Sequence, residues 1–326
     1  MKPTDIKNEI VKLLSANEFL SGEELGDELG MSRAAISKHV KGLQQVGLDI
    51  FSVPGRGYKL ASGIDILCYD KISSMLGSHA GGLDVCNIVS STNDIVKEDI
   101  RLKSNGHVCI AEAQTDGRGR RGRQWYSPFG ANIYMSMVWH FENGFQAMSG
   151  LSLAIGVALC EALDDLGITG AQVKWPNDLL IANKKVAGVL IETEGYSDGS
   201  CSAIVGCGIN FKMADDIATI DQPWTDLTSH ANEQVDRNLV VAKIVEKLRR
   251  TLGCFERDGF GQFKALWEAK HAFANKTVCL TSGMNKFVGV AKGVDHSGAL
   301  IIECINDAGT PELQHFHGGE VSVRSV

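Results

Sequence analysis

Four arginines and three glycines occupy seven consecutive positions, residues 117–123. This segment, the Arg–Gly loop, limits the possible folds more than any other, because a hydrophobic core cannot hold so many guanidinium groups. It must lie at a surface between regular elements. Glycines let a backbone close tightly over a ligand, and arginines offer planar sets of donors that match phosphate and carboxylate. The loop is predicted to hold an anionic ligand that carries phosphate.

Two alternative interpretations of this loop need to be weighed. Gly117, Gly119 and Gly122 also satisfy the dinucleotide-binding pattern G-x-G-x-x-G, which requires an apolar helix directly afterwards. Residues 125–128 are Trp-Tyr-Ser-Pro, so we reject a dinucleotide-binding fold. A solvated basic loop that binds RNA or a membrane surface is the second alternative, and the formal net charge of −7 disfavours it.

Length and composition indicate a folded protein with several domains. A chain of 326 residues suggests two or three domains, and 44% hydrophobic with 22% charged residues is ordinary for a globular protein. Nine cysteines without a Cys-x-x-Cys pair, and no apolar segment at the amino terminus, favour a reducing cytoplasm. Charges interrupt every long apolar stretch, so we expect no membrane insertion.

The first sixty residues predict two helices joined by a turn. Ser21 and Glu24 form a capping-box pattern at the start of one helix, and Ser32 caps a second helix. Apolar residues recur at helical spacing on the second helix. Strands at residues 50–53 and 58–60 flank a Pro-Gly-Arg-Gly turn, which predicts a hairpin. This order is typical of a winged helix-turn-helix.

Charge separates along this segment, because residues 18–28 carry only negative charges and residues 33–41 only positive ones. The polar face of the second helix can therefore reach phosphates and base edges in a DNA major groove, and the hairpin can touch the backbone. The alternative is an ordinary three-helix core with a charged, solvated face. The candidate DNA-binding residues are Ser32, Arg33, Ser37, Lys38, Lys41, Gln44 and Arg56.

Three further motifs carry candidate chemistry. Residues 173–181 predict a strand, a proline turn and a second strand, and a further turn leads into a strand at 185–192. Adjacent antiparallel strands would bring Asp178 close to Lys185. Gly206 and Gly208 remove side chains from a strand, which lets a ligand approach the backbone. Residues 90–94 place small hydrogen-bonding groups at a helix start. Taken singly, these features could be turn residues, a surface lysine and helix caps.

Taken in order, the motifs closely resemble the biotin protein ligases, and with the amino-terminal helix-turn-helix they resemble the bifunctional biotin operon repressors. The motifs are Ser91-Thr92-Asn93, Gln114 with the Arg–Gly loop and Trp125, Lys174-Trp175-Pro176-Asn177-Asp178, Lys185-x-Ala187-Gly188, and Gly206-x-Gly208-Ile209-Asn210. The resemblance covers nearly the whole chain.

This resemblance implies an α+β architecture with three domains. Residues 1–62 would form the winged helix-turn-helix, residues 63–273 an α/β ligase domain with a mixed sheet like that of class II synthetases, and residues 274–326 a small SH3-like β-barrel. Apolar residues at helical spacing over 151–166 and 238–255 predict helices that cover the sheet. His315 and His317 are interpreted as exposed turn residues, and we expect no metal site in the protein.

The resemblance also implies an activity. Biotin and ATP, with Mg²⁺, would give biotinyl-5'-AMP, and the biotin would pass to a lysine of a biotin carboxyl carrier protein. A ligand-promoted homodimer would bind the operator DNA of biotin genes. The implied catalytic residues are Arg118, Arg120, Asp178 and Lys185. The implied substrate-binding residues are Ser91, Thr92, Asn93, Gln114, Gly117, Arg118, Gly119, Arg120, Trp125, Asn177, Lys185, Gly206, Gly208, Asn210 and Arg324.

Two rival functions stay open from the sequence. The chain could be a ligand-sensing transcription regulator that binds but does not catalyse, or a lipoate or octanoyl ligase of related fold. Intact Arg118, Lys185 and Asp178 disfavour the first, and the Arg–Gly loop together with the Lys-Trp-Pro-Asn-Asp segment disfavours the second.

Overall fold

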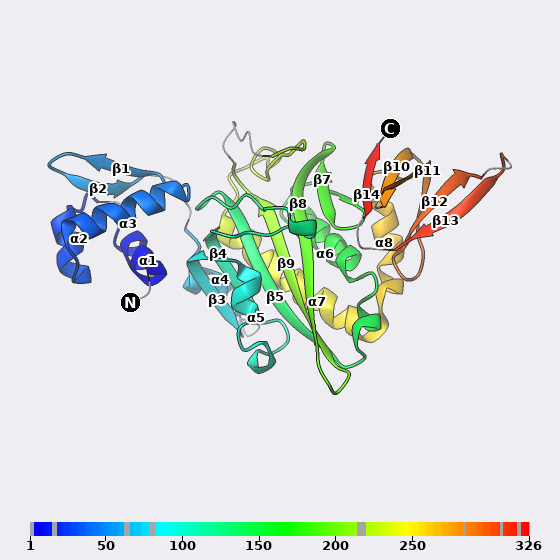
Figure 1. The fold of residues 1–326 in the computed structure, drawn as a ribbon, viewed down its shortest axis with the longest axis horizontal. Helices are drawn as coiled ribbons and strands as arrows, with labels where there is room; N and C mark the ends of the chain where they lie inside the picture. The colour runs from blue at the N-terminus through cyan, green and yellow to red at the C-terminus, as the bar shows by residue number, and fades with distance from the viewer. Residues whose placement is uncertain are drawn as a thin grey trace.

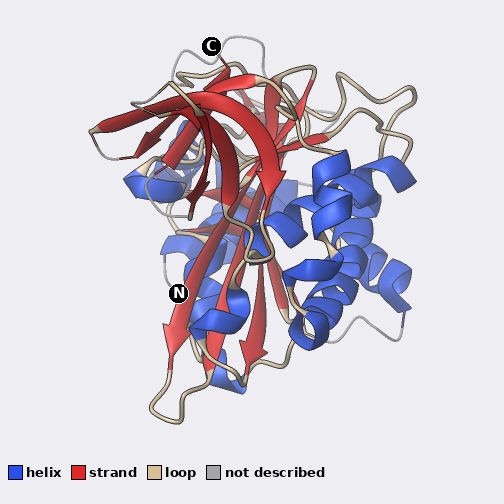
Figure 2. Ribbon diagram, turned by 90° about the vertical axis from the view of Figure 1, so that its right-hand side faces the viewer, coloured by secondary structure: helices blue, strands red, loops and turns tan. Residues whose placement is uncertain are grey.

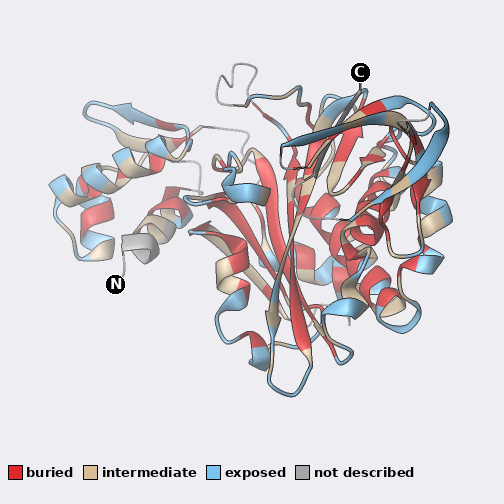
Figure 3. Cartoon of the chain, turned by 45° about the vertical axis from the view of Figure 1, so that its right-hand side comes forward, coloured by how far each residue is buried: buried red, intermediate tan, exposed pale blue. Residues whose placement is uncertain are grey.

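The structure is a computed structural model that describes residues 3–14, 18–61, 66–77, 82–213, 220–282, 284–306, 309–317 and 321–325. A small amino-terminal unit lies at one side of a long central sheet, and a carboxy-terminal sheet lies at the other side (Figure 1). In Figure 3 the middle of the central sheet is buried, whereas the wing strands and much of the carboxy-terminal sheet are exposed.

The amino-terminal unit is the expected winged helix-turn-helix. Ser21 Oγ accepts from Glu24 N at 3.0 Å while Glu24 Oε2 accepts from Ser21 N at 2.7 Å, so the predicted capping box is confirmed. Ser32 caps the next helix through Ala35 N. The elements are α1 (Pro3–Leu14), α2 (Gly22–Leu29), α3 (Arg33–Gln45), β1 (Ile50–Val53) and β2 (Gly57–Leu60).

This unit packs directly on the central part of the chain. Its core of buried residues from α1, α3 and the wing continues into Ile88, Ala113 and Phe129 of the central part. Phe129 N donates to Val46 O, at the end of α3, at 3.0 Å. The end of helix α3 is therefore tied by a backbone hydrogen bond to the segment that follows the Arg–Gly loop. The expected domain limit at residue 62 lies outside the described residues.

The described central part contains a seven-stranded mixed sheet, in the order β3-β4-β5-β9-β8-β7-β6. Only the β3–β4 pair is parallel. The strands are β3 (Leu83–Val89), β4 (Val108–Gln114), β5 (Asn132–Phe141), β6 (Gln172–Lys174), β7 (Asp178–Ile181), β8 (Lys184–Gly195) and β9 (Cys201–Asn210). The mixed sheet expected from the sequence is confirmed.

Helices cover both faces of this sheet. Met137 and Val205 pack with α6 (Leu151–Asp165) and α7 (Arg237–Asp258), whereas their neighbours Val138 and Ile204 pack with residues of α5 (Thr92–Lys97). Successive side chains of a strand point to opposite faces, so α6 and α7 lie on one face and α5 on the other. A further short helix, α4 (Tyr69–Leu76), packs against α7.

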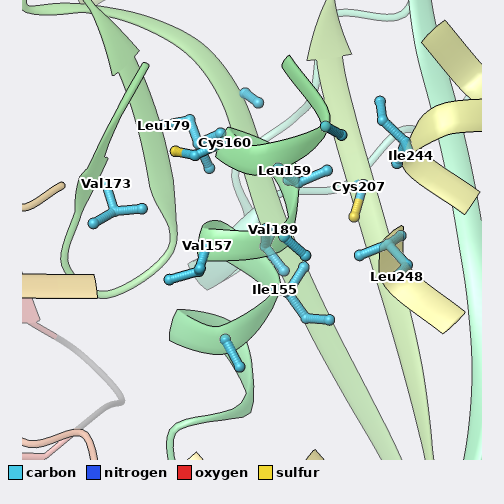
Figure 4. Close-up of a cluster of buried hydrophobic side chains, with 14 of the residues drawn as sticks. Ile155, Val157, Leu159, Cys160, Val173, Leu179, Val189, Cys207, Ile244 and Leu248 are labelled. Atoms are coloured by element: carbon cyan, nitrogen blue, oxygen red, sulfur yellow. The ribbon is translucent and has the colours of Figure 1, made fainter. Parts of the chain in front are cut away.

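The helix α6 is apolar on nearly all sides. Residues Phe145–Asp165 are long and apolar enough to cross a membrane by composition, and 61% of that window is buried inside the structure. In Figure 4, Leu159 of α6 points toward Cys207 of β9 and Ile244 of α7, whereas Val157 points the other way, toward Val173, so both sides of the helix are packed. A helix in a core needs no polar face, which accounts for the composition. The expectation of a cytoplasmic protein stays a prediction.

A buried ion pair joins the sheet to α7. Arg237 Nη2 lies 2.5 Å from Glu112 Oε2, and both side chains are fully buried. Arg237 Nη1 also donates to Asn132 O at 3.2 Å, and the other oxygen of Glu112 accepts from Leu67 N. One pair of charges therefore links β4, β5, α7 and the segment that leaves the amino-terminal unit.

The carboxy-terminal strands form a five-stranded antiparallel sheet among the described residues, in the order β13-β12-β11-β10-β14. Figure 2, from the side of this sheet, shows its strands curving. The strands are β10 (Thr277–Ser282), β11 (Asn285–Val294), β12 (Leu300–Ile305), β13 (Pro311–Phe316) and β14 (Val321–Ser325), which follow α8 (Lys264–Ala269).

One expectation about this region was wrong. His315 lies on the strand β13 and not in a turn, and its Nδ1 lies 2.9 Å from Asp295 Oδ2. His317 follows the strand and is exposed. Within the described ranges no group of three or more histidine, cysteine, aspartate or glutamate residues could hold a metal ion.

Candidate active site

A cavity of about 400 Å³ opens on one face of the central sheet. The start of α5, the Arg–Gly loop, the β6–β7 turn, β8, β9 and residues 221–223 line it. Most of the residues that the sequence nominated meet here. Those in the lining are Ser91, Thr92, Asn93, Gln114, Arg118, Gly119, Arg120, Trp125, Asn177, Asp178, Lys185, Gly206 and Gly208.

Glycines make room for this cavity. Gly188 and Gly208 face each other across β8 and β9, and the ring of Trp125 lies against both. A Cβ atom at Gly208 would lie 2.4 Å from Trp125 Cε2, and one at Gly206 would lie 2.5 Å from Asn93 Oδ1. Trp125 Nε1 is buried without a hydrogen-bond partner among the described residues. Such a donor indicates a place where a ligand acceptor can bind.

One end of the cavity is neutral and polar. Gln114 Oε1 accepts from Thr92 N at 2.9 Å, and Thr92 Oγ1 lies 2.6 Å from Ser136 Oγ of β5. Ser91 stands at the N-cap of α5, yet its side chain makes no capping hydrogen bond. Helix capping therefore does not account for Ser91, contrary to the simplest alternative. These groups can form hydrogen bonds with an uncharged ring that carries both donors and acceptors.

A second part of the cavity lining carries paired charges. Lys185 Nζ lies 2.7 Å from Asp178 Oδ1, so the predicted closeness of these two residues is confirmed. Lys174 Nζ is 3.6 Å from the other oxygen of Asp178. The side chains of Asp178 and Lys185 are only 14% and 15% exposed. Lys185 Nζ also lies 5.3 Å from the centre of the Trp125 ring, which places the ammonium group in the cavity wall.

The hairpin between these residues has a simple local cause. Ala182 and Asn183 both adopt positive φ values, 50° and 62°. Two such residues form the tight turn whose twist matches a hairpin. Lys185 pairs with Leu180, and Asp178, two residues earlier on β7, has its side chain on the same face, which brings the two charged groups together.

The two arginines chosen from the Arg–Gly loop have different surroundings. Arg118 donates two hydrogen bonds to Asp94, which raise the pKa of Arg118 and lower that of Asp94. Arg120 Nη1 donates to Asn177 Oδ1 at 3.1 Å, and burial lowers the pKa of Arg120. The charge of Arg118 already faces a protein carboxylate, so Arg120 is the better placed of the two for a phosphate.

Two of the nominated residues, Gly117 and Asn210, do not line the cavity among the described residues, and a third lies outside this comparison. Gly117 packs under the loop, where a Cβ would lie 2.5 Å from Ser127 Oγ. Asn210 is buried and its Nδ2 donates to Lys185 O at 3.3 Å and Thr225 O at 2.9 Å, so it fixes backbone and does not face a ligand. Arg324 lies on β14, and its side chain is outside what the structure describes.

The structure also brings in residues that sequence reasoning missed. They are Ser136, Lys174, Gly188, Asp221, Gln222, Pro223 and Phe273, together with the carboxylates Asp94 and Glu192 behind the loop. Lys174 and Gly188 stand inside motifs already noted, so the motif itself was the available signal. Residues 221–223 carry no such signal. A long-range hydrogen bond, from Lys185 N to Pro223 O, brings them to the cavity.

The candidate DNA-binding residues divide into two groups. Arg33, Lys38 and Lys41 are exposed on α3, and Arg56 is exposed in the wing with its guanidinium 4.6 Å from the Phe19 ring centre. Two others have structural partners. Ser32 caps α3, and Gln44 Nε2 donates to Ile50 O at 2.9 Å. Ser37 is partly exposed.

Comparisons with known proteins agree with this arrangement. The model of the biotin/lipoate A/B protein ligase family matches residues 85–210, that of the HTH domain residues 7–59, and that of the biotin protein ligase C terminal domain residues 273–324. Among solved structures, the biotin protein ligase from Aquifex aeolicus in complex with biotin and ATP is similar, with a TM-score of 0.65 and 30% identity. It covers 75% of this chain and 99% of that one.

Some relatives match the whole chain, and the match therefore includes the helix-turn-helix at residues 7–59. The bifunctional ligase/repressor BirA of Salmonella typhimurium is 42% identical over 100% of both chains. The protein of the same name from Escherichia coli is 40% identical, over 100% of this chain and 99% of that one. The chain therefore belongs to the family of bifunctional biotin ligase/repressor proteins.

Proposed function

We propose that this protein is a biotin–[acetyl-CoA-carboxylase] ligase that also represses biotin synthesis genes. It forms biotinyl-5'-AMP from biotin and ATP and transfers biotin to a lysine of a biotin carboxyl carrier protein. The observation that carries this proposal is the meeting of a neutral polar end, a glycine floor and a lysine–aspartate pair in one cavity below the Arg–Gly loop. Relatives that match the full length of the chain are named bifunctional ligase/repressor.

In the first step, a carboxylate oxygen of biotin attacks the α-phosphorus of ATP and pyrophosphate leaves. Negative charge grows on the phosphoryl oxygens, so positioned cations give most of the rate gain. Arg120, beside Asn177, and Lys185, beside Asp178, are the groups that meet this charge. Ser91, Thr92 and Gln114 hold the ureido ring. Magnesium arrives with ATP and supplies further positive charge at its phosphates.

In the second step, the neutral amine of a carrier lysine attacks the acyl carbon, AMP leaves, and the amine loses a proton. Asp178 is the base we propose for that proton, because its carboxylate lies in the cavity. Lys174 and Lys185 both face Asp178. Their positive charges lower the pKa of a carrier lysine that approaches, which favours its neutral, nucleophilic form. The mixed anhydride hydrolyses in water, so a loop that covers it protects the intermediate.

The repressor function needs two copies of the chain on a palindromic operator. Beyond Val189, β8 has no strand partner on its β7 side within the described ranges, so a second copy could extend the sheet there. We propose a homodimer that biotinyl-AMP promotes. The limits 1–62, 63–273 and 274–326 stay our proposed domain boundaries.

The test of the enzyme is biotin-dependent release of pyrophosphate from ATP, with lipoate and octanoate as comparison acids. We expect release with biotin alone, and Arg120→Ala should lower its rate at least about tenfold, since it removes a cation from the developing charge. Arg101→Ala, which removes an exposed arginine paired with Asp198, is the matched control and should leave the rate unchanged. No release with any acid would favour a ligand-sensing regulator, and release with octanoate would favour the related acyl ligases.

The test of the repressor is binding to a duplex that carries the region upstream of the biotin synthesis genes. With biotin and ATP present, Lys38→Ala/Lys41→Ala should reduce the slope of log affinity against log salt by about 2, because each lost phosphate contact removes nearly one unit. Lys286→Ala/Lys292→Ala removes two charges from the carboxy-terminal sheet and is the control. Equal loss in both double variants would exclude α3 as the DNA-binding surface.

A further inference from the structure

The segment before α2 pairs with the wing. Leu20 forms an antiparallel bridge with Tyr58 of β2, in which Leu20 N donates to Tyr58 O at 2.9 Å and Tyr58 N donates to Leu20 O at 2.8 Å. Gly57 permits this close approach, because a Cβ atom there would lie 2.6 Å from the carbonyl carbon of Leu20. The next residues of an antiparallel pair also oppose each other, so Phe19 stands opposite Lys59.

The ring of Phe19 gathers two cations of the wing. The guanidinium carbon of Arg56 lies 4.6 Å from the centre of this ring, and Lys59 Nζ lies 5.8 Å from it. At such distances the face of an aromatic ring attracts a positive charge. Two cations that share one ring also repel each other, so the ring stabilises an arrangement that the two side chains alone would avoid.

The charges of these two residues are not neutralised inside the protein. Within the part of the chain that the structure describes, neither Arg56 nor Lys59 forms an ion pair with a carboxylate. Arg56 is exposed and Lys59 is half-buried, in a wing that lies at the outer side of the molecule (Figure 1). Each strand of B-DNA carries one phosphate per about 3.4 Å of helix axis, so two cations held beside one ring can meet neighbouring phosphates.

The wing cations lie close to the start of α3. A Cβ atom at Gly22, the first residue of α2, would lie 3.0 Å from Arg33 Cγ and 3.5 Å from Tyr58 Cε2. Arg33 begins α3, and Tyr58 precedes Lys59 on β2. The first residue of α2 therefore contacts both α3 and the wing, so the cations of these two elements can bind the same duplex.

We propose that Phe19 is a positioning residue that holds Arg56 and Lys59 together as one phosphate-binding site on the wing. Arg56 was nominated from the sequence, whereas Phe19 and Lys59 were not. The proposal rests on the proposed repressor function for its ligand, the backbone phosphates of the operator, and on the contacts above for the gathering of the two cations. Phe19 acts through these cations, which it orders before DNA binds.

The first measurement needs no DNA. Groups that lie over the face of an aromatic ring give NMR resonances that are shifted upfield. In the full-length protein with isotope-labelled arginine and lysine, the side-chain resonances of Arg56 and Lys59 should show this shift, and Phe19→Leu should abolish it. Phe19→Tyr keeps a ring at the same place and should keep the shift. Unshifted resonances of both residues in the parent protein would overturn the role of Phe19.

The second measurement is the affinity of the same variants for the duplex upstream of the biotin synthesis genes, over a range of salt, with biotin and ATP present. Arg56→Met/Lys59→Met should lower the slope of log affinity against log salt by about 2, because each lost phosphate contact removes nearly one unit. Phe19→Leu should keep the slope within about 0.5 of the parent value but weaken binding about fivefold or more, since both side chains must then be ordered when DNA binds. Phe19→Tyr should restore the parent affinity.

A double-mutant cycle separates positioning from a general role in the fold. If Phe19 acts through the two cations, adding Phe19→Leu to Arg56→Met/Lys59→Met should cause no further loss of affinity. A further loss as large as that in the parent background would show that Phe19 supports the wing in another way, and it would overturn the proposal. Tyr69→Leu removes an exposed ring from α4 and is the matched control, which should leave affinity and slope unchanged.

The two measurements also separate this proposal from the repressor function. Upfield shifts that Phe19→Leu abolishes, in a parent protein that binds no duplex, would overturn the repressor function and the phosphate site, while the gathering of the two cations would stand. A parent protein that binds the operator, with Phe19→Leu binding equally well, would overturn the proposal and leave the repressor function intact.

Discussion

Lys185→Met is expected to lower the rate of biotin-dependent adenylate formation by about 100-fold or more, the usual cost of losing a group that stabilises developing charge. Lys185 Nζ lies in the cavity wall, 2.7 Å from Asp178 and over the ring of Trp125. The substitution keeps the length and apolar stem of the side chain but removes its charge, and Lys174 stays paired with Asp178. Pyrophosphate exchange at saturating ATP measures the loss.

Lys184→Met provides the control for this prediction. Lys184 is the preceding residue of β8, so its side chain points to the opposite side of the strand, and it is exposed. The control should exchange pyrophosphate at the parent rate and melt at the parent temperature. An activity of Lys185→Met within threefold of the parent would remove Lys185 from the proposed mechanism.

Arg237→Met is expected to destabilise the central part of the protein by about 3–5 kcal/mol, the range found when one partner of a buried ion pair is removed. The guanidinium of Arg237 faces Glu112 in a region with no solvent access, so the variant leaves a carboxylate buried without its partner. Because that pair also joins β4, β5 and α7, the loss should be seen as a lower urea midpoint by tryptophan fluorescence.

Two variants make this stability prediction specific. Arg257→Met removes an arginine from the same helix whose side chain is 65% exposed, and it should shift the midpoint little. Glu112→Gln combined with Arg237→Met should recover a large part of the loss, since no uncompensated charge is left buried. A loss in Arg237→Met no larger than that in Arg257→Met would show that the ion pair adds nothing to stability.

Local sequence signals predicted those features that depend on near neighbours in the chain. The capping box at Ser21 and Glu24, the cap at Ser32 and the approach of Asp178 to Lys185 are all confirmed. Each involves residues three to seven positions apart, where backbone geometry alone decides which groups meet. The winged helix-turn-helix and the mixed sheet followed from such signals together with the resemblance to biotin protein ligases.

Local signals did not reveal the hydrogen-bond partners that two nominated side chains have inside the protein. Gln44 was nominated for DNA, and it bonds the backbone of the wing at Ile50. Asn210 was nominated for substrate, and it fixes the backbone of Lys185 and Thr225. Both residues have the right chemistry for the nominated role, so their types could not separate a ligand contact from a structural one.

The classes of element, the exposure of the Arg–Gly loop and the set of chemical groups in the site follow from the order of residues along the chain. Which of these groups contact one another depends on long-range packing. The order β5-β9-β8 brings Ser136, Gly206 and Glu192 beside the start of α5, although more than fifty residues separate Ser136 from Glu192 along the chain. That strand order is stabilised by burial of one face of the sheet beneath α6 and α7 and of the other face beneath α5. Such burial involves many long-range contacts, which no short motif contains. The same packing gives the two arginines different partners. Arg118 is paired with Asp94, and Arg120 contacts Asn177 in the cavity lining.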